Sequence, residues 1–233
     1  GDFCNRKKNG ELYWERASIS PVRNAAGEIA HFVAVKEDIT GQKQAELIRV
    51  ARSRVLEQFS TANTLGDIFS ALVCYVEEIF PGCPASVLML DESGRRLRCG
   101  ASTGLPEFYN QAIDGLEIGP QVGSCGAAAY SGQRVVVEDI ETHPNWIPFR
   151  SLARQAGLRA CWSEPILSSA GKVVGTFAVY SLQPATPKGD DLYQLEEASR
   201  LAGLVIERKR TEQALQLTQF SVDTAHDAIF WIR

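Results

Sequence analysis

The sequence predicts an α+β protein in which a central antiparallel β-sheet is flanked by helices. Strand-like runs rich in valine and aromatic residues are concentrated between residues 81 and 182. On either side of that region lies a long stretch that contains no proline and many helix-forming residues. The 233 residues are 45% hydrophobic, which is enough for the core of an ordinary globular protein.

The first 40 residues predict a β-hairpin. The strand-like runs "GELYWERASISPV" and "EIAHFVAVKEDIT" flank "RNAAG", in which Asn24 and Gly27 favour a turn. A two-stranded unit is only marginally stable in water, so we expect these strands to complete a sheet that begins upstream of Gly1. Because Met89 is the only methionine, we expect the chain to be an internal part of a longer protein.

The next segment predicts two helices, one reaching about Phe59 and one reaching Phe80, with a break around "TANTLGD". Further strands are predicted at "PASVLMLDES", "RRLRCGAS", "RVVVEDI", "RACWSEPIL" and "KVVGTFAVYSL", the first two as a hairpin around Gly94. Helical segments are predicted between them at "PEFYNQAI", "GSCGAAAYSG" and "NWIPFRSLARQAG", the last ending at Gly157.

A long helix is predicted from Lys188 onward. Residues at heptad spacing along it favour a coiled-coil seam and a parallel homodimer: Leu201, Leu204, Arg208, Thr211 and Leu215. As an alternative, the helix packs back on its own sheet as far as Ile206.

Composition excludes several classes of partner. The net charge of −4 comes from mixed signs without a basic run, so we expect no nucleic-acid partner. No apolar stretch approaches the roughly 20 residues of a membrane helix, so we expect no direct membrane contact and a cytoplasmic location. The cysteines are widely spaced without a CxxC pair, which predicts reduced thiols and no metal site: Cys4, Cys74, Cys83, Cys99, Cys125 and Cys161.

Three segments resemble known signalling domains. "NRKKNGELYWERASISPVRNAAGEIAHFVAVKEDIT" resembles the C-terminal strands of a PAS domain. The motifs "VGSCGAAAYSGQRVVVEDI", "NWIPFRSLARQAGLRACWSEPI" and "GKVVGTFAVY" resemble a GAF domain of bacterial sensor kinases and cyclic-di-GMP signalling proteins. "TEQALQLTQFSVDTAHDAIFWI" resembles the start of another PAS domain.

The resemblance implies a PAS–GAF–PAS part of a bacterial multidomain signalling protein. We place the end of a PAS domain at 1–40, a signalling helix at 41–60, the GAF domain at 61–206, a linker helix at 207–221 and the start of a second PAS domain at 222–233. The parent protein is expected to be a sensor histidine kinase or a diguanylate cyclase or phosphodiesterase.

The triplet Asp38, Ile39 and Thr40 matches the signature that closes a PAS domain. An Asp or Thr before a helix caps its free N–H groups, which would tie the last strand to the outgoing helix and transmit strain. The triplet can equally be a helix cap without any switching role.

A GAF pocket is expected to bind a small molecule that the sequence does not identify. Residues expected to converge there, each of which can also be core, are Tyr109, Cys125, Asp139, Trp146, Cys161, Trp162 and Ser163. By strand alternation Cys161 shares a face with Ser163, and Trp162 lies on the other face. We expect Cys161 to be a buried neutral thiol.

The sequence lacks the motifs that would indicate a bound cofactor or a catalytic site. Covalent bilin attachment needs a Cys-His pair, which is absent, and of the three histidines only His143 is in the GAF region, in a turn. Glu15 stands where flavin-binding PAS domains often carry Asn. Neither a G-x-S-x-G elbow nor a Walker, HExxH or GGDEF motif occurs, so we expect no catalytic residues.

Three functions remain. The first is a sensory and relay module without enzymatic activity. The second is a thiol enzyme, because Cys125 in "GSCGAA" and Cys161 in "RACWSE" resemble two cysteines of the free methionine-(R)-sulfoxide reductases, although the spacing after Cys161 is shorter and a third cysteine has no match. The third is a dimerisation spacer that binds no ligand.

Overall fold

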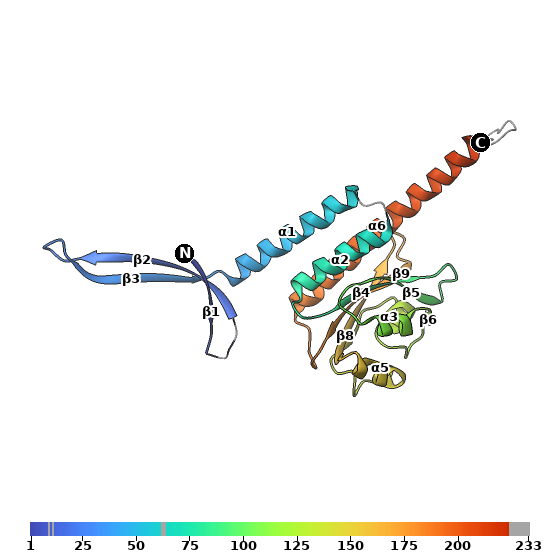
Figure 1. The fold of residues 1–233 in the computed structure, drawn as a ribbon, viewed down its shortest axis with the longest axis horizontal. Coiled ribbons are helices and arrows are strands. Elements are labelled where there is room, and N and C mark those ends of the chain that lie inside the picture. Colours follow the sequence, from blue (N-terminus) through green and yellow to red (C-terminus); the bar gives the residue numbers. More distant parts are fainter. Residues whose placement is uncertain (9, 11, 62–63, 224–233) are drawn as a thin grey trace. The chain divides into compact units, whose positions relative to one another are not determined.

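The computed structural model describes residues 1–8, 10, 12–61 and 64–223, with Leu215 described by its backbone alone. The described chain forms two compact units, Gly1–Arg54 and Val55–Arg233 (Figure 1). Most of the expected second PAS segment at 222–233 lies outside the described residues.

The first unit is built on a three-stranded antiparallel sheet in the order β1-β2-β3. Its strands are β1 (Asp2–Arg6), β2 (Leu12–Arg23) and β3 (Ile29–Asp38). The predicted hairpin is therefore confirmed, and the Asn24 side chain accepts hydrogen bonds from the N–H groups of Ala26 and Glu28, each at 3.0 Å. Gly27 has φ of 83°, which glycine adopts without strain. The short strand β1 was not predicted, because its five residues carry no apolar alternation.

The residues Asp38, Ile39 and Thr40 join this sheet to helix α1 (Thr40–Thr61). The Asp38 carboxylate accepts a hydrogen bond from the N–H of Thr40 at 2.9 Å. Hydrogen bonding to the side chain of Thr40 and to this N–H lowers the pKa of Asp38. The hydroxyl of Thr40 accepts from the N–H of Trp14 at 2.9 Å, and the N–H of Ile39 donates to the carbonyl of Trp14 at 2.9 Å. The start of α1 is thus fastened directly to β2.

The second unit has a six-stranded antiparallel sheet in the order β6-β5-β4-β9-β8-β7. Its strands are β4 (Ala85–Leu90), β5 (Arg96–Ser102), β6 (Leu116–Glu117), β7 (Val135–Val137), β8 (Ala160–Leu167) and β9 (Val173–Ser181). The five predicted strands are confirmed, including the hairpin around Gly94. The two-residue strand β6 is too short to leave a pattern in the sequence.

Helices cover both faces of this sheet (Figure 1). Helices α2 (Leu65–Ile79) and α6 (Gly189–Asp223) pack side by side on one face. The other face carries α3 (Glu107–Ile113), α4 (Cys125–Ser131), the 3-10 helix η1 (Pro144–Phe149) and α5 (Arg150–Gln155). The sheet is therefore a wall between two separate layers of helices.

Local chemistry explains where these helices begin and end. Helix α2 starts at a capping box, in which Thr64 and Asp67 each accept a hydrogen bond from the other's N–H. The segment predicted as one helix from Asn145 to Gly157 is divided into η1 and α5, because Pro148 has no N–H for a continuous α-helix. Gly157 ends α5 as predicted, with φ of 73°.

The first half of α6 packs on its own sheet. Its buried side chains include Leu195, Ala198, Leu201, Ala202, Val205 and Ile206. The expectation that Leu201 belongs to a dimer seam is therefore wrong for this residue, because only 6% of it is exposed within the monomer. Leu204, in contrast, is 51% exposed. Among the described helices, none has both the length and the apolar composition needed to cross a membrane.

Candidate functional site

A small apolar cavity lies between the second sheet and the layer of short helices. Its volume is about 20 Å³, close to the minimum needed for one water molecule. It is lined by Leu88, Tyr109, Ile113, Leu116, Val122, Gly123, Ser124, Cys125, Gly126, Trp146, Phe149, Leu152 and Tyr180. Three of the predicted residues, Tyr109, Cys125 and Trp146, are therefore brought together at one site.

Hydrogen bonds fix the indole of Trp146 against the start of α4. Its Nε1 donates to the hydroxyl of Ser124 at 3.0 Å, and that hydroxyl donates to the carbonyl of Cys161 at 3.3 Å. The backbone N–H of Gly123 donates to the carbonyl of Asn145 at 2.9 Å. These bonds link η1, α4 and β8 around the cavity.

Cys125 and Cys161 are neighbouring buried thiols from different elements. Cys125 is the first residue of α4 and is 8% exposed, whereas Cys161 lies in β8 and is fully buried. A hydrogen bond from Cys161 lowers the pKa of Cys125 to about 7, although burial of the sulfur acts in the opposite direction. Burial raises the pKa of Cys161 well above its ordinary value, and its hydrogen bond to Cys125 adds to that effect. Cys161 is thus the buried neutral thiol that the sequence predicts.

Three hydroxyl groups surround the Cys125 sulfur. The hydroxyl of Tyr180 lies 3.8 Å from it and 3.4 Å from the hydroxyl of Ser86. The buried hydroxyls of Ser163 and Thr176 have no hydrogen-bond partner in the described part of the chain. Both can turn toward the Cys125 sulfur, and both lower its pKa. Ser163 therefore does not line the cavity itself, but it lowers the pKa of Cys125, which does.

Trp162 lies on the opposite face of β8 from Cys161, as strand alternation predicts. It does not line the cavity, so the prediction that it belongs to the pocket is wrong. Its ring contacts Phe80 at the end of α2, with ring centroids 6.2 Å apart in an edge-to-face arrangement. Its Nε1 donates to the carbonyl of Ala185 at 3.4 Å. Trp162 is part of the core between the sheet and the long helices.

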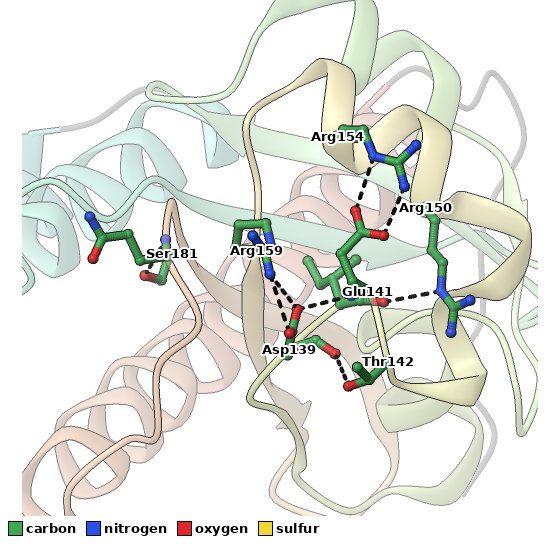
Figure 2. A network of polar contacts seen from close by, with 9 residues as sticks. Asp139, Glu141, Thr142, Arg150, Arg154, Arg159 and Ser181 are labelled. Atoms are coloured by element: carbon green, nitrogen blue, oxygen red, sulfur yellow. Dashed lines mark hydrogen bonds and ion pairs between the residues drawn. The ribbon is translucent and has the colours of Figure 1, made fainter.

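Asp139 also does not line the cavity. Figure 2 shows that its carboxylate faces Arg159, whose guanidinium donates to both carboxylate oxygens at 3.1 and 3.2 Å. Beside this pair, Arg154 donates two hydrogen bonds to Glu141. Arg150 donates to the carbonyls of Ile140 and His143, both at 3.4 Å. The network fixes the turn that leads into η1, and so supports Trp146 indirectly.

The main residue that sequence reasoning missed is Tyr180. It pairs with Cys161 across β8 and β9, and its ring packs edge-to-face on Tyr109 with centroids 5.9 Å apart. Alternation places Tyr180 on one face with Ala178 and Thr176, but the strand register that sets it beside Cys161 is not visible in the sequence. Among the residues that the structure describes, no cluster of three or more His, Cys, Asp or Glu side chains can hold a metal ion.

Comparison with known proteins gives one family and several relatives. A family model of the GAF domain matches residues 62–207. The chain is 36% identical over 224 residues to the methyl sulfide methyltransferase-associated sensor of Methanosarcina acetivorans, a match that covers 95% of this chain and 22% of that protein. The chain thus spans about a fifth of the length of this relative.

Solved structures share the fold at lower identity. A domain described as part of a two-component sensor histidine kinase of Sinorhizobium meliloti aligns with a TM-score of 0.54 and 22% identity, covering 66% of this chain and 99% of that one. The free methionine-R-sulfoxide reductase of Neisseria meningitidis aligns with a TM-score of 0.56 and 20% identity, covering 72% of this chain and 91% of that one.

Proposed function

The chain belongs to the GAF domain family, and from this premise we propose that it is a sensory and relay module without enzymatic activity. In this proposal the cavity beside Tyr109, Cys125 and Trp146 binds a small molecule, and the long helices carry the response to neighbouring domains. The parent protein would be a cytoplasmic sensor histidine kinase or a diguanylate cyclase or phosphodiesterase.

The observation that carries the proposal is the two-sided arrangement of β8. On one face, Cys161 and Ser163 lie behind the cavity, and on the other face Trp162 packs toward the layer of α2 and α6. A molecule that enlarges the cavity must displace this strand or the short helices opposite it. Because β8 is closely packed on both sides, a displacement reaches the long helices.

The cavity also limits the class of ligand. Its walls are mostly apolar, with the hydroxyls of Tyr109, Ser124 and Tyr180 as the polar groups. At about 20 Å³ it takes a guest of very few atoms, and anything larger requires movement of η1 and α5. We therefore propose a small, largely apolar ligand, and the name of the Methanosarcina relative places methyl sulfides among the compounds to test.

We expect a panel of such compounds, methyl sulfides included, to contain at least one that raises the melting temperature of the reduced protein. Leu152→Phe adds volume at the cavity wall and should abolish the shift. The matched control Leu182→Phe, at a side chain that is 54% exposed, should retain it. If no compound in a broad panel changes the melting temperature, the proposal fails and the ligand-free spacer takes its place.

The thiol-reductase alternative has one observation in its favour, because Cys125 and Cys161 lie in the same buried cluster. Against it, the cavity is too small in this form for an amino acid such as methionine sulfoxide. In the same preparations, free methionine-(R)-sulfoxide supplied with a thiol reductant should release no methionine. Turnover that is lost in Cys161→Ser would replace the sensory proposal with the reductase.

The first unit fits the relay through its joint to α1. Residues 1–40 would be the end of a PAS domain, and 222–233 the start of another. The contacts of Asp38, Ile39 and Thr40 with their neighbours fasten the helix to β2, so that a change in the sheet would act on the helix.

We also propose a parallel homodimer through α6 from Leu204 onward. Leu204 is 51% exposed on α6, and Leu215 follows it in the heptad pattern. Leu204→Glu together with Leu215→Glu should shift the protein from dimer to monomer at low micromolar concentration, because both place a charge in an apolar seam. Light scattering measures the mass, and Tyr193→Glu, at an exposed site of the same helix, is the control. A wild-type monomer, or a dimer unaffected by the double change, would contradict the seam.

A further inference from the structure

We propose that Cys125 and Cys161 form a redox switch, in which a small hydroperoxide oxidises Cys125 and Cys161 then closes a reversible disulfide between α4 and β8. This activity goes beyond ligand sensing and does not depend on it. It assigns a covalent role to the two buried thiols that the binding proposal leaves unused.

The two thiols are held close together by the fold. Both are free and lie in one buried core cluster. Tyr180, which pairs with Cys161 across β8 and β9, places its hydroxyl 3.8 Å from the Cys125 sulfur. The hydroxyl of Ser124 donates to the carbonyl of Cys161 at 3.3 Å, which holds the start of α4 against β8 directly beside the pair. A disulfide requires this kind of proximity between the two backbones.

The polar groups around the pair indicate a role beyond packing. An apolar core gains nothing from buried hydroxyls without partners, because each loses its hydrogen bonds to water. Ser163 and Thr176 nevertheless place two such hydroxyls next to Cys125, and Tyr180 adds a third at 3.8 Å. Together with the thiol of Cys161, these hydroxyls are the groups that stabilise a Cys125 thiolate.

The cavity assigns different roles to the two cysteines. Cys125 lines it, whereas Cys161 is fully buried behind it. A volume of about 20 Å³ admits only the smallest oxidants and excludes bulky ones. The pKa of about 7 at Cys125 gives a large thiolate fraction at neutral pH, while the raised pKa of Cys161 keeps that thiol protonated until its partner is oxidised.

The chemistry balances with hydrogen peroxide as the two-electron oxidant. The Cys125 thiolate attacks one peroxide oxygen, an S–O bond forms, the O–O bond breaks, and the hydroxide released takes a proton to leave as water. The Cys161 sulfur then attacks the sulfenic acid of Cys125, the S–S bond forms, and the S–O bond breaks. The departing hydroxide leaves as a second water with the proton of Cys161. A thiol reductant returns both cysteines to the starting state.

Such a disulfide would act on β8, the strand through which the proposed relay passes. It would tie α4 covalently to β8, whose opposite face packs on α6. The redox state of the pair would thus act on the same strand as a ligand in the cavity.

The test exposes the full chain to hydrogen peroxide at neutral pH, quenches it with an alkylating reagent and maps the thiols by mass spectrometry. We expect a Cys125–Cys161 crosslink that a thiol reductant removes. The exposed cysteines Cys4, Cys74 and Cys99 are internal controls. Because its pKa is lowered, Cys125 should react faster than these controls at neutral pH.

Two variants separate the steps. Cys161→Ser, which keeps a hydrogen-bond donor beside Cys125, should accumulate a sulfenic acid at Cys125 that dimedone traps when the protein is unfolded in the quench. Tyr180→Phe should slow oxidation of Cys125 while the crosslink still forms. If wild-type Cys125 reacts no faster than the exposed cysteines, or if peroxide gives only other crosslinks, the switch is refuted even if a variant fails to fold. The thermal-shift assay uses reduced protein, so its outcome is independent of this one.

Discussion

Gly203→Ala is expected to lower the free energy of unfolding by about 1–3 kcal/mol, because it forces two backbones apart. A Cβ atom at Gly203 of α6 would overlap the carbonyl oxygen of Leu167 at the end of β8, and would lie 3.6 Å from a methyl group of Ile166. The obstructing atom belongs to the backbone of a strand, so no side-chain rotation relieves the overlap. The helix must move away from the sheet, and buried neighbours such as Ala202 and Ile206 lose packing.

The control for this change is Gly189→Ala in the same helix. No atom outside its immediate neighbours lies within 4 Å of a Cβ at Gly189, so this change should be neutral or slightly stabilising. Urea unfolding of both variants measures the difference. Equal stability of the two variants would show that α6 does not depend on its close approach to β8, and would remove the route by which the cavity is proposed to act on the helix.

Local signals in the sequence predict most of the elements of this fold. Turn residues at Asn24, Gly27 and Gly94 have the backbone or side-chain roles that the sequence suggests, and strand alternation places Cys161 and Trp162 on opposite faces of β8. These predictions succeed because turns and alternation depend on residues close together in the chain. The division of the Asn145–Gly157 segment could also have been predicted, since Pro148 lies within it.

The candidate site was predicted less completely, because it depends on pairing between distant strands. Tyr109, Cys125 and Trp146 meet at the cavity, but Tyr180 joins them only through the register of β9 on β8. Asp139 illustrates the opposite error: a carboxylate after a strand suggests a site, yet here it pairs with Arg159 and holds a turn. Leu201 shows that heptad spacing alone does not separate a dimer seam from a helix face buried in its own domain.

Trp146→Ala is expected to have the largest effect on stability of the changes proposed, about 3–5 kcal/mol lost from the free energy of unfolding. Trp146 is only 3% exposed. Its indole packs edge-to-face on Phe149, with ring centroids 6.4 Å apart, and closes one side of the cavity. Ser124 keeps its hydrogen bond to the carbonyl of Cys161 when the indole is removed, so the loss comes mainly from packing.

The space left by Trp146 should join the existing cavity and make a larger apolar site. Such a site binds a matching aromatic molecule, so added indole should raise the melting temperature of Trp146→Ala and leave that of the wild type unchanged. The neighbouring change Ile147→Ala is the control, because this side chain is 62% exposed and its loss should cost no more than about 0.5 kcal/mol. Denaturant unfolding measures the free energy of unfolding, and thermal melts with and without indole measure the shift in melting temperature.

A loss below about 1 kcal/mol for Trp146→Ala would show that the indole side chain does not close a packed cavity wall. Equal stabilisation of the wild type by indole would show that the existing cavity already opens to a guest of that size, and the ligand class proposed for it would have to be widened.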